Sequence, residues 1–87
     1  MKVLGIKDIE RKDVPIYYRR LFTGTAVFDI FGKSMEGRID FSIETKPTGH
    51  KDITVSLLDP IDYPLIPLVA ALRRTVDDLD EAGGLPG

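Results

Sequence analysis

The chain has no cysteine, no tryptophan and only one histidine among its 87 residues. Without cysteine it cannot form a disulfide scaffold, a thiolate zinc site or an iron–sulfur cluster. No apolar run approaches the roughly 18 residues that a membrane-spanning helix needs, and the polar start is unlike a signal peptide. We therefore expect a cytoplasmic protein that makes no contact with a membrane.

Neither sign of charge dominates the sequence. Twelve basic and 14 acidic residues give a net charge of −2, and 43% of the residues are hydrophobic, which is ordinary for a globular protein. At this length we expect one small α+β domain, residues 1–87, that buries only roughly 60% of the surface of its unfolded chain. A deep substrate cavity is difficult to form in so small a core, so we predict a protein that is not an enzyme and holds no cofactor.

The middle of the chain alternates between apolar and polar residues, which is typical of strands with one buried face and one solvated face. Stretches rich in turn-forming residues, 32–37 and 47–50, separate the alternating runs. The pattern predicts an antiparallel meander whose strands are these: residues 25–31, 38–46 and 52–57.

The N-terminal part leaves the number of strands open. Residues 16–22 are rich in β-forming residues, and Gly24 is either a bulge in one long strand or a turn that adds a fourth. Residues 2–6 are a candidate edge strand. The charged stretch 7–13 is predicted to be a loop or a frayed helical turn, so residues 1–14 are expected to combine an edge strand with a charged loop.

After Leu57 the periodicity becomes helical. Apolar residues recur at spacings of four and three, and the glycines at 83 and 84 end the pattern, leaving 83–87 as a flexible tail. We expect this stripe either to pack on the sheet or to form the seam of a helix dimer. The predicted fold is α+β: an antiparallel three- to four-stranded meander sheet with one C-terminal amphipathic helix packed on its apolar face. The predicted stripe consists of Leu65, Val69, Leu72, Val76 and Leu79.

One feature of this helix goes against electrostatic expectation. Acidic residues crowd its C-terminal end, where the helix macrodipole disfavours negative charge. Two pairs four residues apart, Arg73–Asp77 and Arg74–Asp78, are predicted to offset part of that cost. The acidic residues are Asp77, Asp78, Asp80 and Glu81.

The two parts of the chain differ in charge, with +3 over residues 1–51 and −5 over residues 52–87. In the basic part, aromatic and basic residues interleave, and single-stranded nucleic acids bind such surfaces by stacking and phosphate neutralisation. In a strand, however, Arg19 and Arg20 point to opposite faces, and each could instead lie over the strand's own tyrosines. The candidate nucleic-acid-binding residues are Tyr17, Tyr18, Arg19, Arg20, Phe22, Lys33 and Arg38.

Catalytic and metal-binding patterns are weak. His50 stands alone in a turn, where a solvated histidine is expected, and no nucleophile elbow is present. Four carboxylates on the predicted polar face could converge on a divalent ion, but we expect cross-strand pairing with Arg38, Lys46 and Lys51 instead. These carboxylates are Asp29, Asp40, Glu44 and Asp52.

The sequence therefore favours a small non-enzymatic protein-interaction module, with a protein partner or a second copy of itself. Small size favours assembly as a homo-oligomer, most simply a homodimer, because association adds buried area. The contact is expected at a strand edge or on the exposed side of the helix. The alternative function is a single-stranded nucleic-acid-binding domain that uses the basic and aromatic residues.

Overall fold

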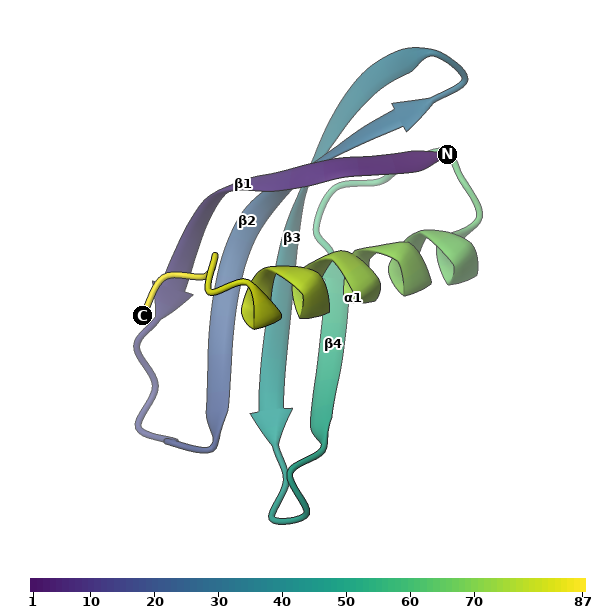
Figure 1. Cartoon of the computed structure of the whole chain (residues 1–87). Coiled ribbons are helices and arrows are strands. Elements are labelled where there is room, and N and C mark those ends of the chain that lie inside the picture. The colour runs from purple at the N-terminus through teal and green to yellow at the C-terminus, as the bar shows by residue number, and fades with distance from the viewer.

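The computed structural model describes residues 1–87 and shows one antiparallel sheet with a single helix across one of its faces (Figure 1). The sheet order follows the chain order, β1-β2-β3-β4, and every neighbouring pair is antiparallel. The predicted α+β meander with a C-terminal helix is confirmed, and the strand number is four. The elements are β1 (Lys2–Lys12), β2 (Arg19–Ile30), β3 (Lys33–Thr45), β4 (Lys51–Leu57) and α1 (Leu65–Glu81).

The core lies between α1 and the face of the sheet that the helix covers, here called the inner face. Phe22 and Phe41 stack there with ring centroids 5.0 Å apart. The outer face is polar, because the strand alternation that buries these residues turns their neighbours to solvent. The buried core residues are Phe22, Ala26, Phe28, Ile30, Ile39, Phe41, Ile43, Val55, Leu68, Leu72 and Val76.

The predicted charged loop over residues 7–13 is wrong, because β1 continues to Lys12. Two register shifts interrupt its pairing with β2, one between Val3 and Gly5 and one between Lys7 and Glu10. Within the second shift, Asp8 has a φ of 53°. Each bulge reverses the inward and outward alternation. The strand therefore carries no period of two that sequence reasoning could detect.

Gly24 is neither a bulge nor a turn. It lies inside the uninterrupted strand β2, where it pairs with Ile39. A Cβ atom at Gly24 would lie 2.9 Å from Cγ2 of Ile6, so this position lacks a side chain because β1 packs directly over it. Of the segment 16–22, only the part from Arg19 onward belongs to the strand.

The turn predicted over residues 32–37 is also wrong. The hairpin between β2 and β3 closes with only two residues, Phe31 and Gly32, because Ile30 pairs with Lys33. Their φ angles of 52° and 77° are both positive, as a type I′ turn requires. Residues 33–37 therefore belong to β3 and lengthen the hairpin. The second predicted turn is confirmed, since β3 ends at Thr45 and β4 begins at Lys51.

The helix packs on the sheet, as one of the two expectations had it, but it is rotated from the predicted stripe. Leu72 and Val76 are buried as expected, whereas Leu65 is 58% exposed and Leu68 takes its place in the core. Every residue from 65 to 72 is apolar. Periodicity in that part of the helix therefore could not show which side meets the sheet.

The helix ends where the glycines predicted. Gly83 has a φ of 72°, and the N–H of Gly84 donates to the carbonyl of Leu79 at 2.8 Å. This is the left-handed ending that glycine favours. Leu85 of the predicted tail then packs against the core. The single helix lacks the length and apolarity needed to cross a membrane.

Candidate functional site

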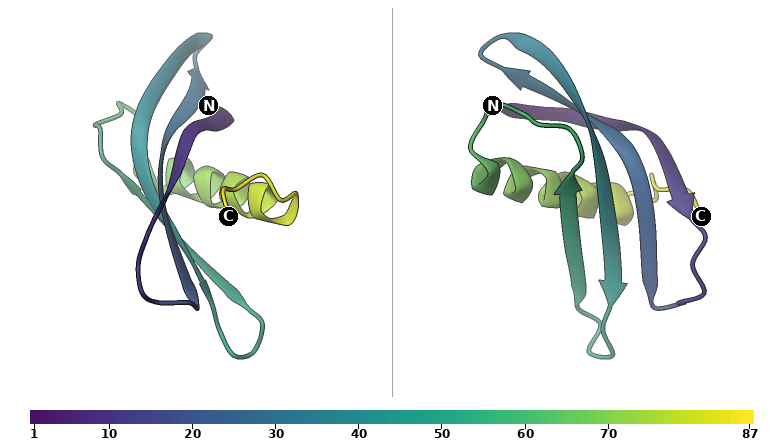
Figure 2. Two further views of the ribbon diagram at one scale, coloured as in Figure 1. Left: turned by 90° about the vertical axis from the view of Figure 1, so that its left-hand side faces the viewer. Right: turned by 180° about the vertical axis from the view of Figure 1, so that it is seen from behind.

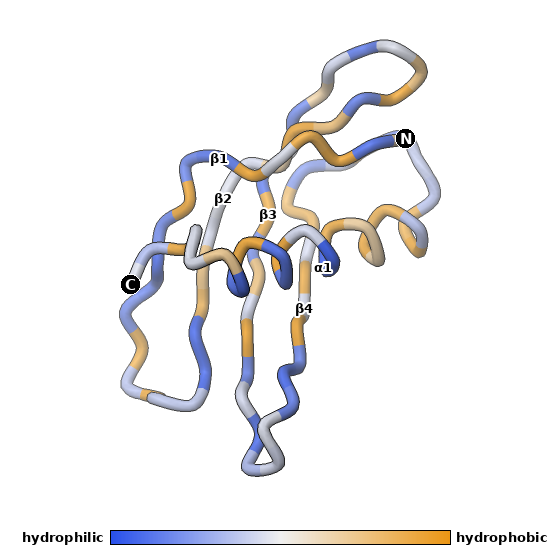
Figure 3. Tube along the Cα trace, viewed as in Figure 1, coloured by the Kyte–Doolittle hydropathy of each residue, from blue (hydrophilic) through white to orange (hydrophobic).

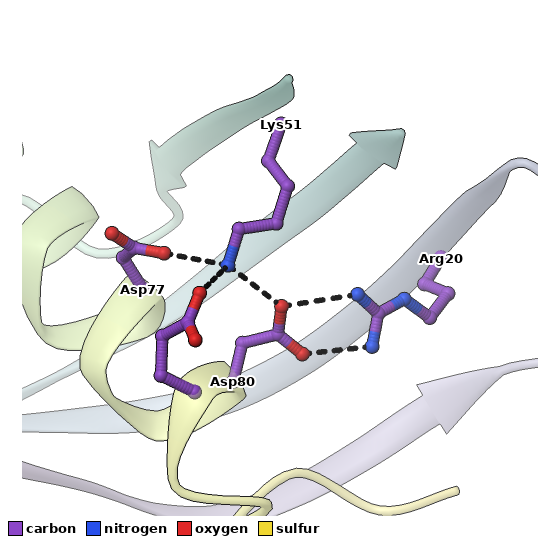
Figure 4. Close-up of polar contacts among 5 residues, drawn as sticks. Arg20, Lys51, Asp77 and Asp80 are labelled. Carbon is purple, nitrogen blue, oxygen red and sulfur yellow. Dashed lines mark hydrogen bonds and ion pairs between the residues drawn. The ribbon is translucent and has the colours of Figure 1, made fainter. Parts of the chain in front are cut away.

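The acidic C-terminal end of α1 lies against two basic side chains of the sheet (Figure 4). Arg20 of β2 donates two hydrogen bonds to the carboxylate of Asp80, at 2.9 and 3.2 Å. The Nζ atom of Lys51 lies 2.7 Å from Asp77, 3.0 Å from Asp80 and 2.9 Å from Glu81. These contacts explain how the helix tolerates negative charge at its C-terminal end, and they fasten that end to the sheet.

The charges in this cluster satisfy one another. The hydrogen bond from Arg20, aided by one from Lys51, lowers the pKa of Asp80 against the opposing effect of burial. Hydrogen bonds to Asp77, Glu81 and Asp80 raise the pKa of Lys51. Because both basic groups are paired, this cluster is a structural tie between the helix and the sheet.

The predicted pairs Arg73–Asp77 and Arg74–Asp78 do not form. The ion pairs of the chain involve neither arginine, since Asp77 is turned toward Lys51. Both guanidinium groups are on exposed residues. They leave unpaired positive charge on the side of α1 that borders β4, where Arg73, Arg74 and Ile53 line one surface hollow.

The structure does not bring the seven candidate nucleic-acid-binding residues together. Phe22 is buried in the core and is 1% exposed. Arg20 lies on the inner face and is bound to Asp80, whereas Arg19 is on the outer face, where it pairs in register with Glu44. The strand alternation that the sequence implied for the two arginines is therefore confirmed.

The remaining basic candidates lie elsewhere. Lys33 begins β3 at the hairpin, while Arg19 begins β2 at the opposite end of the same pair of strands. At about 3.3 Å per residue these ends are about 35 Å apart. Arg38 is held by Asp59, which accepts bonds from its backbone N–H at 2.9 Å and from its guanidinium at 2.9 and 3.2 Å. The same bonds lower the pKa of Asp59 to about 2.

The two tyrosines do share a hollow. Tyr17 and Tyr18 lie in the β1–β2 connection, meet edge to face at 5.8 Å, and line a surface hollow of about 570 Å³. Tyr17 is 96% exposed. The basic residues of the same hollow are already paired, Arg20 with Asp80 and Lys46 with Asp52 at 2.9 Å. The hollow thus offers aromatic surface without an unpaired cation.

The predicted carboxylate face is divided among separate contacts. Asp40 lies 3.4 Å from Lys12, and Asp52 lies 2.9 Å from Lys46 as predicted. The expected pairing of Lys51 on this face is wrong, since Lys51 binds the helix. No three acidic or histidine side chains lie close enough together to hold a metal ion. His50 is exposed in the β3–β4 turn.

The two edges of the sheet differ in how they are protected. Natural sheets protect free edges with bulges, charges or proline, because unpaired backbone groups recruit other strands. The β1 edge has two bulges and six charged residues. The β4 edge is regular, and its residues 53–57 (Ile-Thr-Val-Ser-Leu) are uncharged. Such residues favour strand pairing, so β4 presents an unprotected edge.

Backbone geometry shows which groups β4 offers. At one end of its ladder with β3, Lys46 donates to the carbonyl of His50 at 2.8 Å, and at the other Leu58 donates to Arg38 at 2.9 Å. Hydrogen-bonded and non-bonded pairs alternate along an antiparallel ladder. The even-numbered residues of β4 therefore bond to β3. The backbone groups of Ile53, Val55 and Leu57 point outward from the sheet.

Exposed apolar side chains gather beside this edge. The N-terminal part of α1 extends past β4 (Figures 1 and 2) and is almost wholly apolar (Figure 3). There Leu65 is 58% and Ile66 86% exposed, and Leu58 at the end of β4 is 49% exposed. We call Leu58, Leu65 and Ile66 the apolar shoulder.

Three hollows connect the apolar shoulder to the edge. Leu65 lines both the hollow of about 310 Å³ near Leu57 and the hollow of about 240 Å³ on the helix. Arg73 lines the latter and also the hollow of about 390 Å³ beside Ile53. The shoulder and the β4 edge thus form one continuous surface, which is the candidate interaction site.

The sequence contained part of the signal for this site. The contrast between the charged stretch 2–12 and the uncharged stretch 53–57 is visible in the residues themselves. What it did not reveal is that both stretches are edge strands, because that depends on β1 being a strand. The exposure of Leu65 and Ile66 was hidden in the same way, since both fit a helix stripe that faces the sheet.

Comparison with curated proteins and with solved structures found no match. Residues 1–81, which include all four strands and the whole of α1, match the model of one protein family. The chain therefore belongs to that family, the BB_0187 family.

Proposed function

We propose that this protein is a small non-enzymatic interaction module that binds another protein chain by adding a strand at the β4 edge. The observation that supports the proposal is the contrast between the two edges, since β1 is protected by bulges and charge and β4 is not. Main-chain hydrogen bonds supply the affinity in this mode of recognition, and neighbouring side chains supply the specificity. The apolar shoulder supplies such side chains. A cytoplasmic location stays a prediction from the sequence.

A proline at the edge tests this proposal. Ile53→Pro removes an N–H that points outward, so no bond to β3 is lost and the edge can no longer pair fully. We expect a tagged wild-type protein to capture bound chains and the Ile53→Pro variant to lose at least about nine-tenths of them, because a missing ladder bond also disturbs its neighbours. The measurement is quantitative affinity capture, with far-ultraviolet circular dichroism to show that the sheet is intact.

The matched control is Ile53→Thr, which shortens the same side chain but keeps the edge N–H. It should retain most of the captured chains. Equal capture by the wild-type protein and the proline variant would contradict strand addition at β4, and so would equal loss in the two variants.

A second candidate function is single-stranded nucleic-acid binding at the tyrosine hollow. The observation that favours it is the exposed edge-to-face pair of Tyr17 and Tyr18 in the most voluminous hollow of the protein. Base stacking on such a ring contributes about 1–3 kcal/mol, and the exposed Arg19 is the nearest basic residue along the chain without an ion pair.

If this function holds, Tyr17→Ala should weaken binding of a mixed single-stranded oligonucleotide by at least fivefold, measured by fluorescence anisotropy in 50 mM salt. Binding that depends on phosphate contacts should also weaken further in 200 mM salt. Lys33→Ala, at the distant hairpin, is the control and should leave binding unchanged. Absence of binding by the wild-type protein in 50 mM salt removes this candidate.

A further inference from the structure

We propose that the strand added at the β4 edge is β4 of a second copy, paired antiparallel so that Val55 lies opposite Val55. The two sheets then form one continuous sheet of eight strands, with both helices on the same face. This inference rests on the proposed function, because it names the partner of the same edge. Three properties of the chain support it: the register of β4 with itself, the position of the apolar shoulder, and the small core.

The first argument is that β4 is complementary to itself in this register. Pairing Val55 with Val55 also places Ile53 of one copy opposite Leu57 of the other, and Thr54 opposite Ser56. The inner face of the seam is then wholly apolar, and its outer face carries two hydroxyl pairs, which are favourable cross-strand neighbours. At the ends Lys51 faces Asp59, so no like charges oppose each other.

The register also satisfies the backbone. In an antiparallel ladder whose centre is a hydrogen-bonded pair, every second residue exchanges bonds with the other strand. A centre at Val55 makes the bonding residues Ile53, Val55 and Leu57, whose backbone groups β3 leaves free. The donors and acceptors that β4 turns outward are thus the ones that the second copy needs.

The second argument comes from the apolar shoulder. Leu65, Val69 and Arg73 line one side of α1, and Arg73 also lines the hollow beside Ile53. This side is therefore turned toward the Ile53 end of the free edge. In the antiparallel arrangement that end receives Leu57 of the other copy, which has Leu65 in the adjoining hollow. The two helices meet across the symmetry axis, and each covers apolar surface that the single chain leaves exposed.

The third argument is the size of the core. Only 14 of the 87 residues are buried in the single chain. Domains this small often gain the remaining stability from association. A symmetric pair also uses one surface twice and closes on itself. Pairing at β4 removes the unprotected edge from solution and leaves only the two protected β1 edges at the ends of the combined sheet.

Disulfide trapping tests both the partner and the register, and a chain without cysteine is well suited to it. Thr54 and Ser56 of opposite copies form a non-bonded pair, with Cα atoms about 4.5 Å apart, which is within the range that a disulfide spans. The double variant Thr54→Cys/Ser56→Cys should form a covalent dimer in more than half of the chains under oxidised glutathione. Glu10→Cys/Lys12→Cys on the β1 edge is the matched control and should stay monomeric.

Light scattering supplies the test without crosslinks. The wild-type protein should show twice the mass of one chain, and Ile53→Pro should show the mass of one. Leu65→Glu should weaken the dimer about tenfold, as truncating a central apolar contact does. This variant keeps its fold, because a carboxylate in the first turn of a helix is favourable.

The outcomes separate this inference from the proposed function. A monomeric wild-type protein that yields no crosslinked dimer would overturn the inference. If that monomer still captures another protein, and Ile53→Pro abolishes the capture, strand addition stands and the second copy is wrong. Crosslinking by Thr54→Cys alone would overturn the register, since it places Thr54 rather than Val55 at the centre.

Discussion

Phe41→Ala is expected to lower the free energy of unfolding by about 3–5 kcal/mol. Phe41 is 2% exposed and stacks on Phe22 with ring centroids 5.0 Å apart. Its removal takes away apolar burial from β3, a central strand of the sheet, and leaves a cavity. A domain of this length has a total stability of about 4–13 kcal/mol. The variant should therefore be largely unfolded at 37 °C or lie close to that limit.

The measurement is urea unfolding at one fixed protein concentration, because any self-association makes stability depend on concentration. Tyr17→Ala is the matched control, since it removes an aromatic ring that is 96% exposed. It should change the free energy of unfolding by less than about 0.5 kcal/mol. Similar losses in the two variants would show that Phe41 does not lie in the core described here.

The parts of the fold that sequence predicted are those where alternation was unbroken. Around Phe41 and Val55 each residue keeps the face that a period of two assigns to it, so these strands were recognisable. The β1 strand was missed because its two bulges break the period, and because an edge strand can point charge at solvent on both sides. The long hairpin was shortened in prediction because Gly37 was read as a turn residue.

The candidate site was less predictable for a related reason. A free edge is a property of strand order, which no local pattern contains. The apolar run from 65 to 72 predicted a helix but not its rotation, so the exposure of Leu65 could not be anticipated. By contrast, the basic and aromatic cluster was conspicuous in the sequence. The fold then placed Phe22 in the core and Arg20 against Asp80.

The ion pairs at the end of α1 give the second large expected effect. Asp80→Asn should lower the free energy of unfolding by about 1–3 kcal/mol at pH 7, because Arg20 keeps its partly buried position without a charged partner. The Asp80 side chain is 15% exposed and binds both Arg20 and Lys51. Asp78→Asn removes the same charge from the same helix turn at an exposed position without an ion pair. It should be neutral or slightly stabilising, because the macrodipole disfavours negative charge there.

The pH dependence of this difference follows from the pKa of Asp80, which hydrogen bonding to Arg20 lowers below its ordinary value of 3.8. The unfolded chain then takes up the proton at higher pH than the folded one. The contribution of Asp80 is thus complete above that ordinary value and is lost as pH falls through the lowered, native pKa. Urea unfolding at pH 7, 5, 4 and 3 should show the gap between the wild-type protein and Asp80→Asn constant down to pH 5 and narrowing below pH 4. Asp59 and the other carboxylates titrate in both proteins, so their effects cancel in the comparison. A gap that stays constant to pH 3 would mean that the charge of Asp80 does not tie the helix to the sheet.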